Sequence, residues 1–145
     1  MSGYQRLLLG VDFSKDTATI AARAMDLAAC YQAELNVLHV VEYVPLDPGN
    51  EWMVPPEVEV EQTLMERAEA SMDRLAERLG LSRERCTVAL GSPKHELIRR
   101  AEESATDLIV VGSHGRHGLA RILGSTANGV VHGAPCDVLA VRITD

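Results

Sequence analysis

Short continuous apolar runs alternate along this chain with longer segments whose apolar residues recur at helical spacing. A continuous apolar run of about five residues is typical of a strand buried on both faces. The runs that predict strands are Leu7–Val11, Glu34–Val41, Cys86–Leu90, Asp107–Gly112 and Val138–Ile143. The segments that predict helices are Lys15–Tyr31, Glu57–Leu79, a segment opening at Pro93, and Ser125–His132.

This alternation predicts the fold class. Strand–helix repeats favour an α/β fold, with a parallel sheet and right-handed crossovers. Five strands in this pattern favour a doubly wound, open, Rossmann-like sheet of order 3-2-1-4-5, with helices on both faces. The length of 145 residues fits one domain over residues 1–145. In such sheets ligands bind at the carboxyl ends of the strands where the winding reverses, here between the first and fourth strands.

Local signals predict where the helices begin and end. Ser14 is expected to cap the first helix, with Asp16 in its first turn near the positive end of the helix dipole. Gly80 followed by Leu81 is typical of a Schellman stop. Ser92 is expected to cap the helix that opens at Pro93.

Composition excludes several function classes. The chain is 46% hydrophobic and carries a formal net charge of -7. This negative charge argues against a general nucleic-acid binder and provides no basic face for anionic membranes. Its apolar runs are too short to cross a bilayer, and its start lacks the apolar core of a signal peptide. Cys30, Cys86 and Cys136 are odd in number and far apart, which favours reduced thiols in a cytoplasmic protein.

The segment after the fourth predicted strand is rich in glycine. Gly124, Ser125 and Thr126 lead directly into a predicted helix, so backbone N–H groups and two hydroxyls meet at the positive end of a helix dipole. No Asp or Glu lies between Asp107 and Asp137. The pattern indicates an anion site, although an ordinary loop with a serine cap has the same residues and needs no ligand.

The run D-L-I-V-V-G-S-H-G-R-H-G-L, followed by L-G-S-T-A and A-P-C-D-V-L-A-V, resembles the C-terminal half of the universal stress protein family. The opening L-L-L-G-V-D-F-S, the strand L-N-V-L-H-V-V and the segment G-S-P with E-L-I also resemble that family, in the same order. The resemblance covers nearly the whole chain.

The resemblance implies a site for ATP or a related adenine nucleotide. Asp12 either binds Mg²⁺ through a nucleotide phosphate or caps the first helix together with Ser14. The glycine motif of nucleotide-binding members falls on Gly112, Gly115, Gly124 and Ser125. The family's acidic residue after the first strand falls on Asp12, facing the ribose, and adenine lies near the first two strands. The complete set of implied nucleotide-binding residues is Val11, Asp12, Phe13, Val40, Val41, Gly112, His114, Gly115, Arg116, Gly124, Ser125 and Thr126.

One departure from the family motif leaves two alternatives open. Eight residues separate Gly115 from Gly124 here, where the motif has nine. The loop either absorbs the missing residue, or it moves the helix away from the phosphates. The second case resembles the branch around universal stress protein A, whose members lack ATP binding.

Other chemistry is less well supported by the sequence. A zinc site from His114, His117 and His132 lacks an acidic or cysteine ligand nearby, and no metal site of the protein alone is predicted. His39 lies inside a strand and is interpreted as a packing histidine. No paired base and nucleophile is found, so the chain is predicted not to be an enzyme. Slow ATP hydrolysis, with Asp12 or His114 as base, or phosphotransfer is the least favoured function.

Two surfaces complete the prediction. The loop Tyr43–Pro56 either covers the adenine site, with Trp52 or Met53 on the base, or is a plain surface loop. The resemblance implies a homodimer through the edge strand Val138–Ile143, which would cover an apolar sheet edge. The function predicted is an ATP-responsive stress protein that acts through partner contacts, and the alternative is a dimeric scaffold without nucleotide.

Overall fold

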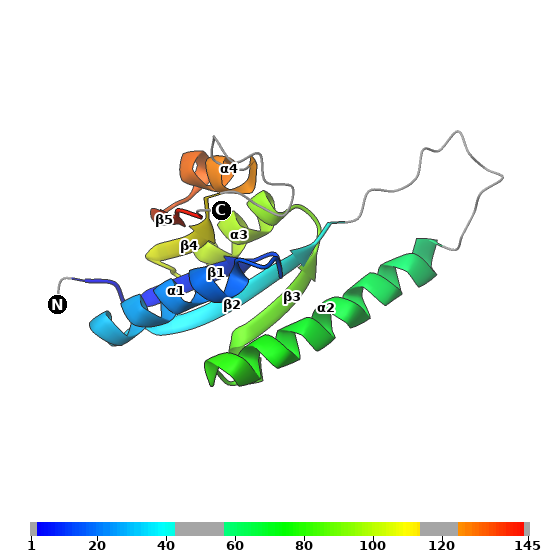
Figure 1. Cartoon of the computed structure of the whole chain (residues 1–145). Coiled ribbons are helices and arrows are strands. Elements are labelled where there is room, and N and C mark those ends of the chain that lie inside the picture. The colour runs from blue at the N-terminus through cyan, green and yellow to red at the C-terminus, as the bar shows by residue number, and fades with distance from the viewer. Residues whose placement is uncertain (1–2, 43–56, 114–124, 144–145) are drawn as a thin grey trace.

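The computed structural model describes residues 3–42, 57–113 and 125–143, with the backbone alone for residues 57–59 (Figure 1). Every segment predicted as a strand or helix forms that element. The strands are β1 (Arg6–Val11), β2 (Glu34–Val41), β3 (Cys86–Leu90), β4 (Leu108–Gly112) and β5 (Asp137–Val141). The helices are α1 (Thr17–Tyr31), α2 (Glu57–Leu79), the 3-10 turn η1 (Arg83–Arg85), α3 (Pro93–Glu103) and α4 (Ser125–Gly133).

The described strands form one parallel sheet in the order β3-β2-β1-β4-β5, which confirms the predicted order. Leu9 in the central strand is aligned with Val37 on one side and with Val110 on the other. All three side chains are almost completely buried. Continuous apolar runs identified these strands because both faces of the sheet are covered.

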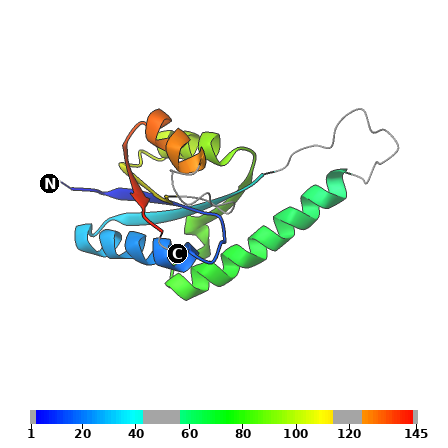
Figure 2. The same ribbon diagram turned by 45° about the horizontal axis from the view of Figure 1, so that its top comes forward.

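Two apolar clusters lie on opposite faces of the sheet. One contains Leu9 and Val110 with Ile20 of α1 and Met72 of α2. The other contains residues of α3 and α4, such as Leu97. Figure 2 shows α1 and α2 on one side of the sheet and α3 and α4 on the other, as the doubly wound prediction requires. Among the described residues, no helix is both long enough and apolar enough to span a membrane.

Helix α2 ends as predicted, in a Schellman motif. Gly80 has a positive φ of 69°, and the Leu81 N–H donates to the Ala76 carbonyl at 3.0 Å. The same pattern ends α3, where the Thr106 N–H donates to the Ala101 carbonyl at 3.0 Å. The left-handed residue at this second end is Ala105, with a φ of 53°. An L side chain in that conformation costs roughly 1–2 kcal/mol.

Replacing Ala105 with glycine is therefore expected to stabilise the protein. Glycine adopts a left-handed φ without the clash of a Cβ atom, so Ala105→Gly should raise the free energy of unfolding by about 0.5–1 kcal/mol. The matched control is Gly80→Ala, whose added Cβ would meet no atom within 4 Å, so it isolates the cost of the backbone conformation. We expect that control to lower stability by about 1 kcal/mol. Urea unfolding measures both, and changes of the same sign would contradict the prediction.

Candidate functional site

The carboxyl ends of β1 and β4 lie side by side at the centre of the sheet. β1 ends at Val11 and β4 at Gly112, and the two strands are hydrogen-bonded neighbours. The next described helix after β1 is α1, which lies on one face of the sheet. The next described helix after β4 is α4, which lies on the opposite face (Figure 1). This is the reversal of winding at which doubly wound sheets bind ligands, and it is where the sequence placed the site.

Asp12 begins a tight turn directly after β1. Its Oδ1 accepts a hydrogen bond from the backbone N–H of Ser14 at 3.0 Å. The predicted role of Ser14 as helix cap is wrong, because α1 begins later, at Thr17, with Asp16 as its N-cap residue and no side-chain capping bond. The Ser14 hydroxyl instead accepts from the Asp16 N–H at 3.3 Å. The Asp12 carboxylate is thus held by the turn and does not cap α1.

Phe13 follows Asp12 in an unusual backbone conformation. Its φ is 57°, a value that costs a residue with a Cβ about 1–2 kcal/mol. The half-buried Phe13 ring packs against the core on the α1 and α2 side of the sheet. It also lies against the imidazole of His39, with 4.3 Å between ring centroids and 39° between ring planes. A contact between rings contributes about 0.5–1.5 kcal/mol beyond buried area, comparable to the cost of the backbone conformation.

His39 connects the first two strands through its side chain. Its Nδ1 lies 2.7 Å from the carbonyl oxygen of Val11, the residue with which it is in register. The interpretation of His39 as a packing histidine is confirmed, but its contacts with Val11 and Phe13 were missed. They depend on the pairing of β1 with β2, and the sequence carries no local signal for that register.

The two β2 residues predicted beside adenine lie on different faces of the sheet. Val40 packs in the cluster on the α3 and α4 side. Val41 shares a face with Val37, because alternate residues of a strand point the same way, and Val37 belongs to the cluster against which Phe13 packs. The structure therefore brings Val41, and not Val40, to the side of the sheet on which Phe13 lies.

Helix α4 opens with the predicted phosphate ligands. Ser125 is its first residue and is exposed, and Thr126 is half-buried. The first turn carries no acidic residue, so the partial positive charge of the helix N-terminus is not neutralised there. Of the predicted site residues, the structure describes Val11, Asp12, Phe13, Val40, Val41, Gly112, Ser125 and Thr126. The predicted residues His114, Gly115, Arg116 and Gly124 lie outside the described residues, as do His117 and the loop Tyr43–Pro56 with Trp52 and Met53.

Ser113 holds the chain where it leaves β4, a role that the sequence did not reveal. Its backbone N–H donates to the Val141 carbonyl at 2.8 Å. Its hydroxyl accepts from the Ile143 N–H at 3.1 Å. These bonds fix the start of the glycine-rich segment to the end of β5.

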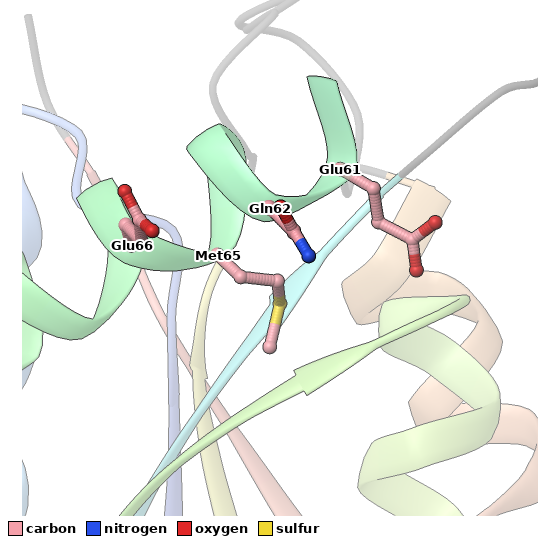
Figure 3. A pocket seen from close by; sticks show the side chains of 4 residues that line it. All are labelled: Glu61, Gln62, Met65 and Glu66. Carbon is pink, nitrogen blue, oxygen red and sulfur yellow. The ribbon is translucent and has the colours of Figure 1, made fainter. Parts of the chain in front are cut away.

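A surface hollow of about 490 Å³ lies elsewhere, against the N-terminal half of α2, lined by Glu61, Gln62, Met65 and Glu66. Figure 3 shows the Met65 side chain pointing from α2 toward the neighbouring strands. None of the lining residues belongs to the predicted site. Its two carboxylates would repel phosphate, so this hollow is a poor candidate for a nucleotide.

Two of the described thiols are buried or half-buried, and the described residues hold no metal ligand set. Cys30, Cys86 and Cys136 are free cysteines. Burial raises the pKa of the Cys86 thiol, and burial with the nearby charge of Asp137 raises that of Cys136, so both thiols are held in the unreactive neutral form. Among the described residues, no three His, Cys, Asp or Glu side chains gather closely enough to hold a metal ion.

Comparison with known proteins identifies relatives over nearly the whole length. Residues 3–142 match the model of the universal stress protein family. The chain is 41% identical over 138 residues to universal stress protein A homolog 1 of Coxiella burnetii. The aligned region covers 95% of this chain and 96% of the relative.

Solved structures agree with this match. Universal stress protein UspA from Lactobacillus plantarum is 28% identical, with 98% of this chain and 100% of that chain covered and a TM-score of 0.81. A universal stress protein solved in complex with cAMP is 27% identical, with 97% and 98% covered and a TM-score of 0.62.

Proposed function

The chain belongs to the universal stress protein family, and from that membership and the geometry of the site we propose that it is a stress-responsive homodimer that binds ATP or a related adenine nucleotide. The nucleotide changes which proteins the dimer contacts, and the protein catalyses no reaction of its own. Three free cysteines support a cytoplasmic location.

The observation that carries this proposal is the position of Asp12 relative to the strand ends. The carboxylate follows β1 at the reversal of winding, next to the end of β4, and α4 is the next described element after that strand. A carboxylate accepts hydrogen bonds from ribose hydroxyls, and a helix N-terminus suits phosphate. These donors and acceptors fit the two polar parts of a nucleotide, with Mg²⁺ reaching Asp12 through the phosphates. The relative solved with cAMP supports the proposal, since cAMP contains adenine, ribose and phosphate.

The proposed dimer forms through β5. Among the described strands this one lies at an edge of the sheet, paired with β4. Three of its residues, Val138, Leu139 and Ala140, are only half-buried. An apolar edge with unpaired backbone groups favours pairing with another strand. A second copy of β5 across a two-fold axis would cover both edges at once.

One sequence observation favours a second candidate. The eight residues between Gly115 and Gly124 are one fewer than the family's nucleotide-binding motif has. If that spacing keeps α4 from the phosphates, the protein is a dimeric scaffold that acts through protein contacts without nucleotide. Affinity for ATP separates the two candidates.

Isothermal titration of ligand-stripped protein with ATP and Mg²⁺ tests the proposal. We expect saturable binding with a Kd on the order of 10 μM, which corresponds to about -7 kcal/mol. Asp12→Ala should weaken binding about 10- to 100-fold, because a hydrogen bond to a charged group contributes about 1.5–3 kcal/mol.

The matched control is Asp16→Ala. It removes the same charge four residues along the chain, from a side chain that makes no capping hydrogen bond. We expect its affinity to stay within about threefold of the unmodified protein, a difference of less than about 0.7 kcal/mol. The absence of saturable heat with the unmodified protein would favour the scaffold, and equal losses in both variants would remove Asp12 from the site.

A further inference from the structure

The imidazole of His39 has a fixed tautomer. Its Nδ1 is 2.7 Å from the Val11 carbonyl oxygen, and a carbonyl oxygen accepts hydrogen bonds but cannot donate. The proton therefore lies on Nδ1, and the Nδ1–H group donates across from β2 to the last residue of β1. This bond orients the carbonyl at the point where the chain leaves the sheet.

The same imidazole ring also packs against Phe13, two residues after Val11. Phe13 has a φ of 57°, and its ring lies 4.3 Å from the imidazole, centroid to centroid. A residue with a Cβ stays in this conformation only where its surroundings hold it. His39 thus contacts the residue before Asp12 through a hydrogen bond and the residue after it through ring packing.

Asp12 itself is held between these two contacts. Its Oδ1 accepts from the Ser14 N–H at 3.0 Å, a bond that requires the turn through Phe13. If Phe13 relaxed to an ordinary negative φ, the chain after Phe13 would change direction, and the Asp12 carboxylate would lose the Ser14 N–H that orients it.

We propose that His39 is a positioning residue of the nucleotide site. It contacts Val11 and Phe13 and so sets the direction of the Asp12 carboxylate. This inference rests on the proposed function, because the group that it positions is the proposed ribose acceptor. His39 acts on the nucleotide through Asp12.

Two substitutions of His39 test this role by ATP titration. His39→Leu keeps apolar volume but removes the donor, and we expect the Kd for ATP to rise about tenfold. In His39→Asn the side-chain amide offers an N–H close to the position of Nδ1, so we expect the Kd to return to within about threefold of the unmodified protein. Recovery by asparagine would not follow from loss of packing alone, since asparagine is smaller and more polar than leucine.

Val37→Ala is the control for lost stability. Val37 is in the same strand and on the same face, and it is 1% exposed, so its truncation lowers the melting temperature by opening a cavity away from Asp12. We expect its Kd for ATP to be unchanged. An affinity loss in Val37→Ala equal to that in His39→Leu would overturn the positioning role.

The tautomer provides a measurement without nucleotide. Long-range ¹H–¹⁵N spectra of the ligand-free protein should show His39 protonated on Nδ1, and a proton on Nε2 alone would overturn the inference whatever the protein binds. If the unmodified protein binds no ATP, the proposed function fails and the positioning role fails with it. If the unmodified protein binds ATP and His39→Leu binds it equally well, only the positioning role is overturned.

Discussion

Truncation of Met72 to alanine is expected to lower the free energy of unfolding by about 2–4 kcal/mol, within the range for buried large-to-small substitutions. Met72 is fully buried, at 0% exposure, in the cluster that joins α2 to the sheet. Truncation of its side chain leaves a buried cavity, and the residues that line the cavity lose their van der Waals contacts with the methionine. Urea unfolding followed by circular dichroism measures the loss, at a fixed protein concentration because a dimer would make stability depend on it.

The control is the same substitution seven residues earlier in the same helix. Met65 is half-buried and lines the open hollow against α2, so Met65→Ala should cost less than about 1 kcal/mol. Both substitutions replace methionine with alanine inside α2, so the change in helix propensity is the same in each and cancels. Equal losses at the two positions would mean that the N-terminal half of α2 packs as closely on the sheet as its C-terminal half does.

The strands and the long helix were predictable for a simple physical reason. A parallel strand covered on both faces needs apolar residues throughout, and the bounds predicted for β2 and β3 are those observed. Helix α2 also has its predicted bounds, because a glycine in the left-handed conformation ends it at Gly80.

The details that the sequence missed include local helix ends and one contact between residues far apart in the chain. Phe13, Gln32 and Ala105 have positive φ values, although residues with a Cβ disfavour them. Gln32 and Ala105 take the left-handed positions that end α1 and α3, where glycine is usual and marks a helix end in the sequence. Phe13 is packed against His39, a residue distant in the chain. The misassigned cap at Ser14 has a local origin, because the Asp12 carboxylate organises a turn there and α1 starts only at Thr17.

The candidate site was predicted in part. Alternation of strands and helices placed Asp12 and Gly112 at the reversal of winding, and the structure puts them at the ends of neighbouring strands. The sequence offered Val40 and Val41 equally for the adenine side, whereas the strand's alternation separates them onto opposite faces. Tertiary packing decides which of the two valines lies on the same side of the sheet as Phe13, and the sequence carries no local signal for that packing.

An acidic residue at the start of α4 is expected to abolish most nucleotide binding while leaving the fold intact. Ser125 is the exposed first residue of α4, whose first turn holds no acid. In Ser125→Asp, a carboxylate would compete with phosphate for the backbone N–H groups, and two charges about 4 Å apart repel by about 4 kcal/mol at an effective dielectric constant of 20. We expect the Kd for ATP to rise at least about 100-fold, or about 2.7 kcal/mol. The same carboxylate favours the helix dipole, so stability should stay constant or rise by about 0.3–1 kcal/mol.

The opposite signs of these two effects make the result diagnostic, since a damaged fold would lower affinity and stability together. Ser92→Asp is the matched control: Ser92 is the N-cap residue of α3, which follows β3, and β2 and β1 separate β3 from β4 in the sheet. The same charge added there should stabilise α3 similarly and change the Kd for ATP by less than about threefold.

Equal losses of affinity in both variants would indicate a general effect of negative charge, and an unchanged Kd in Ser125→Asp would show that α4 does not bind the phosphates. A selective loss in Ser125→Asp alone would mean that the shortened glycine-rich segment still brings α4 to the nucleotide.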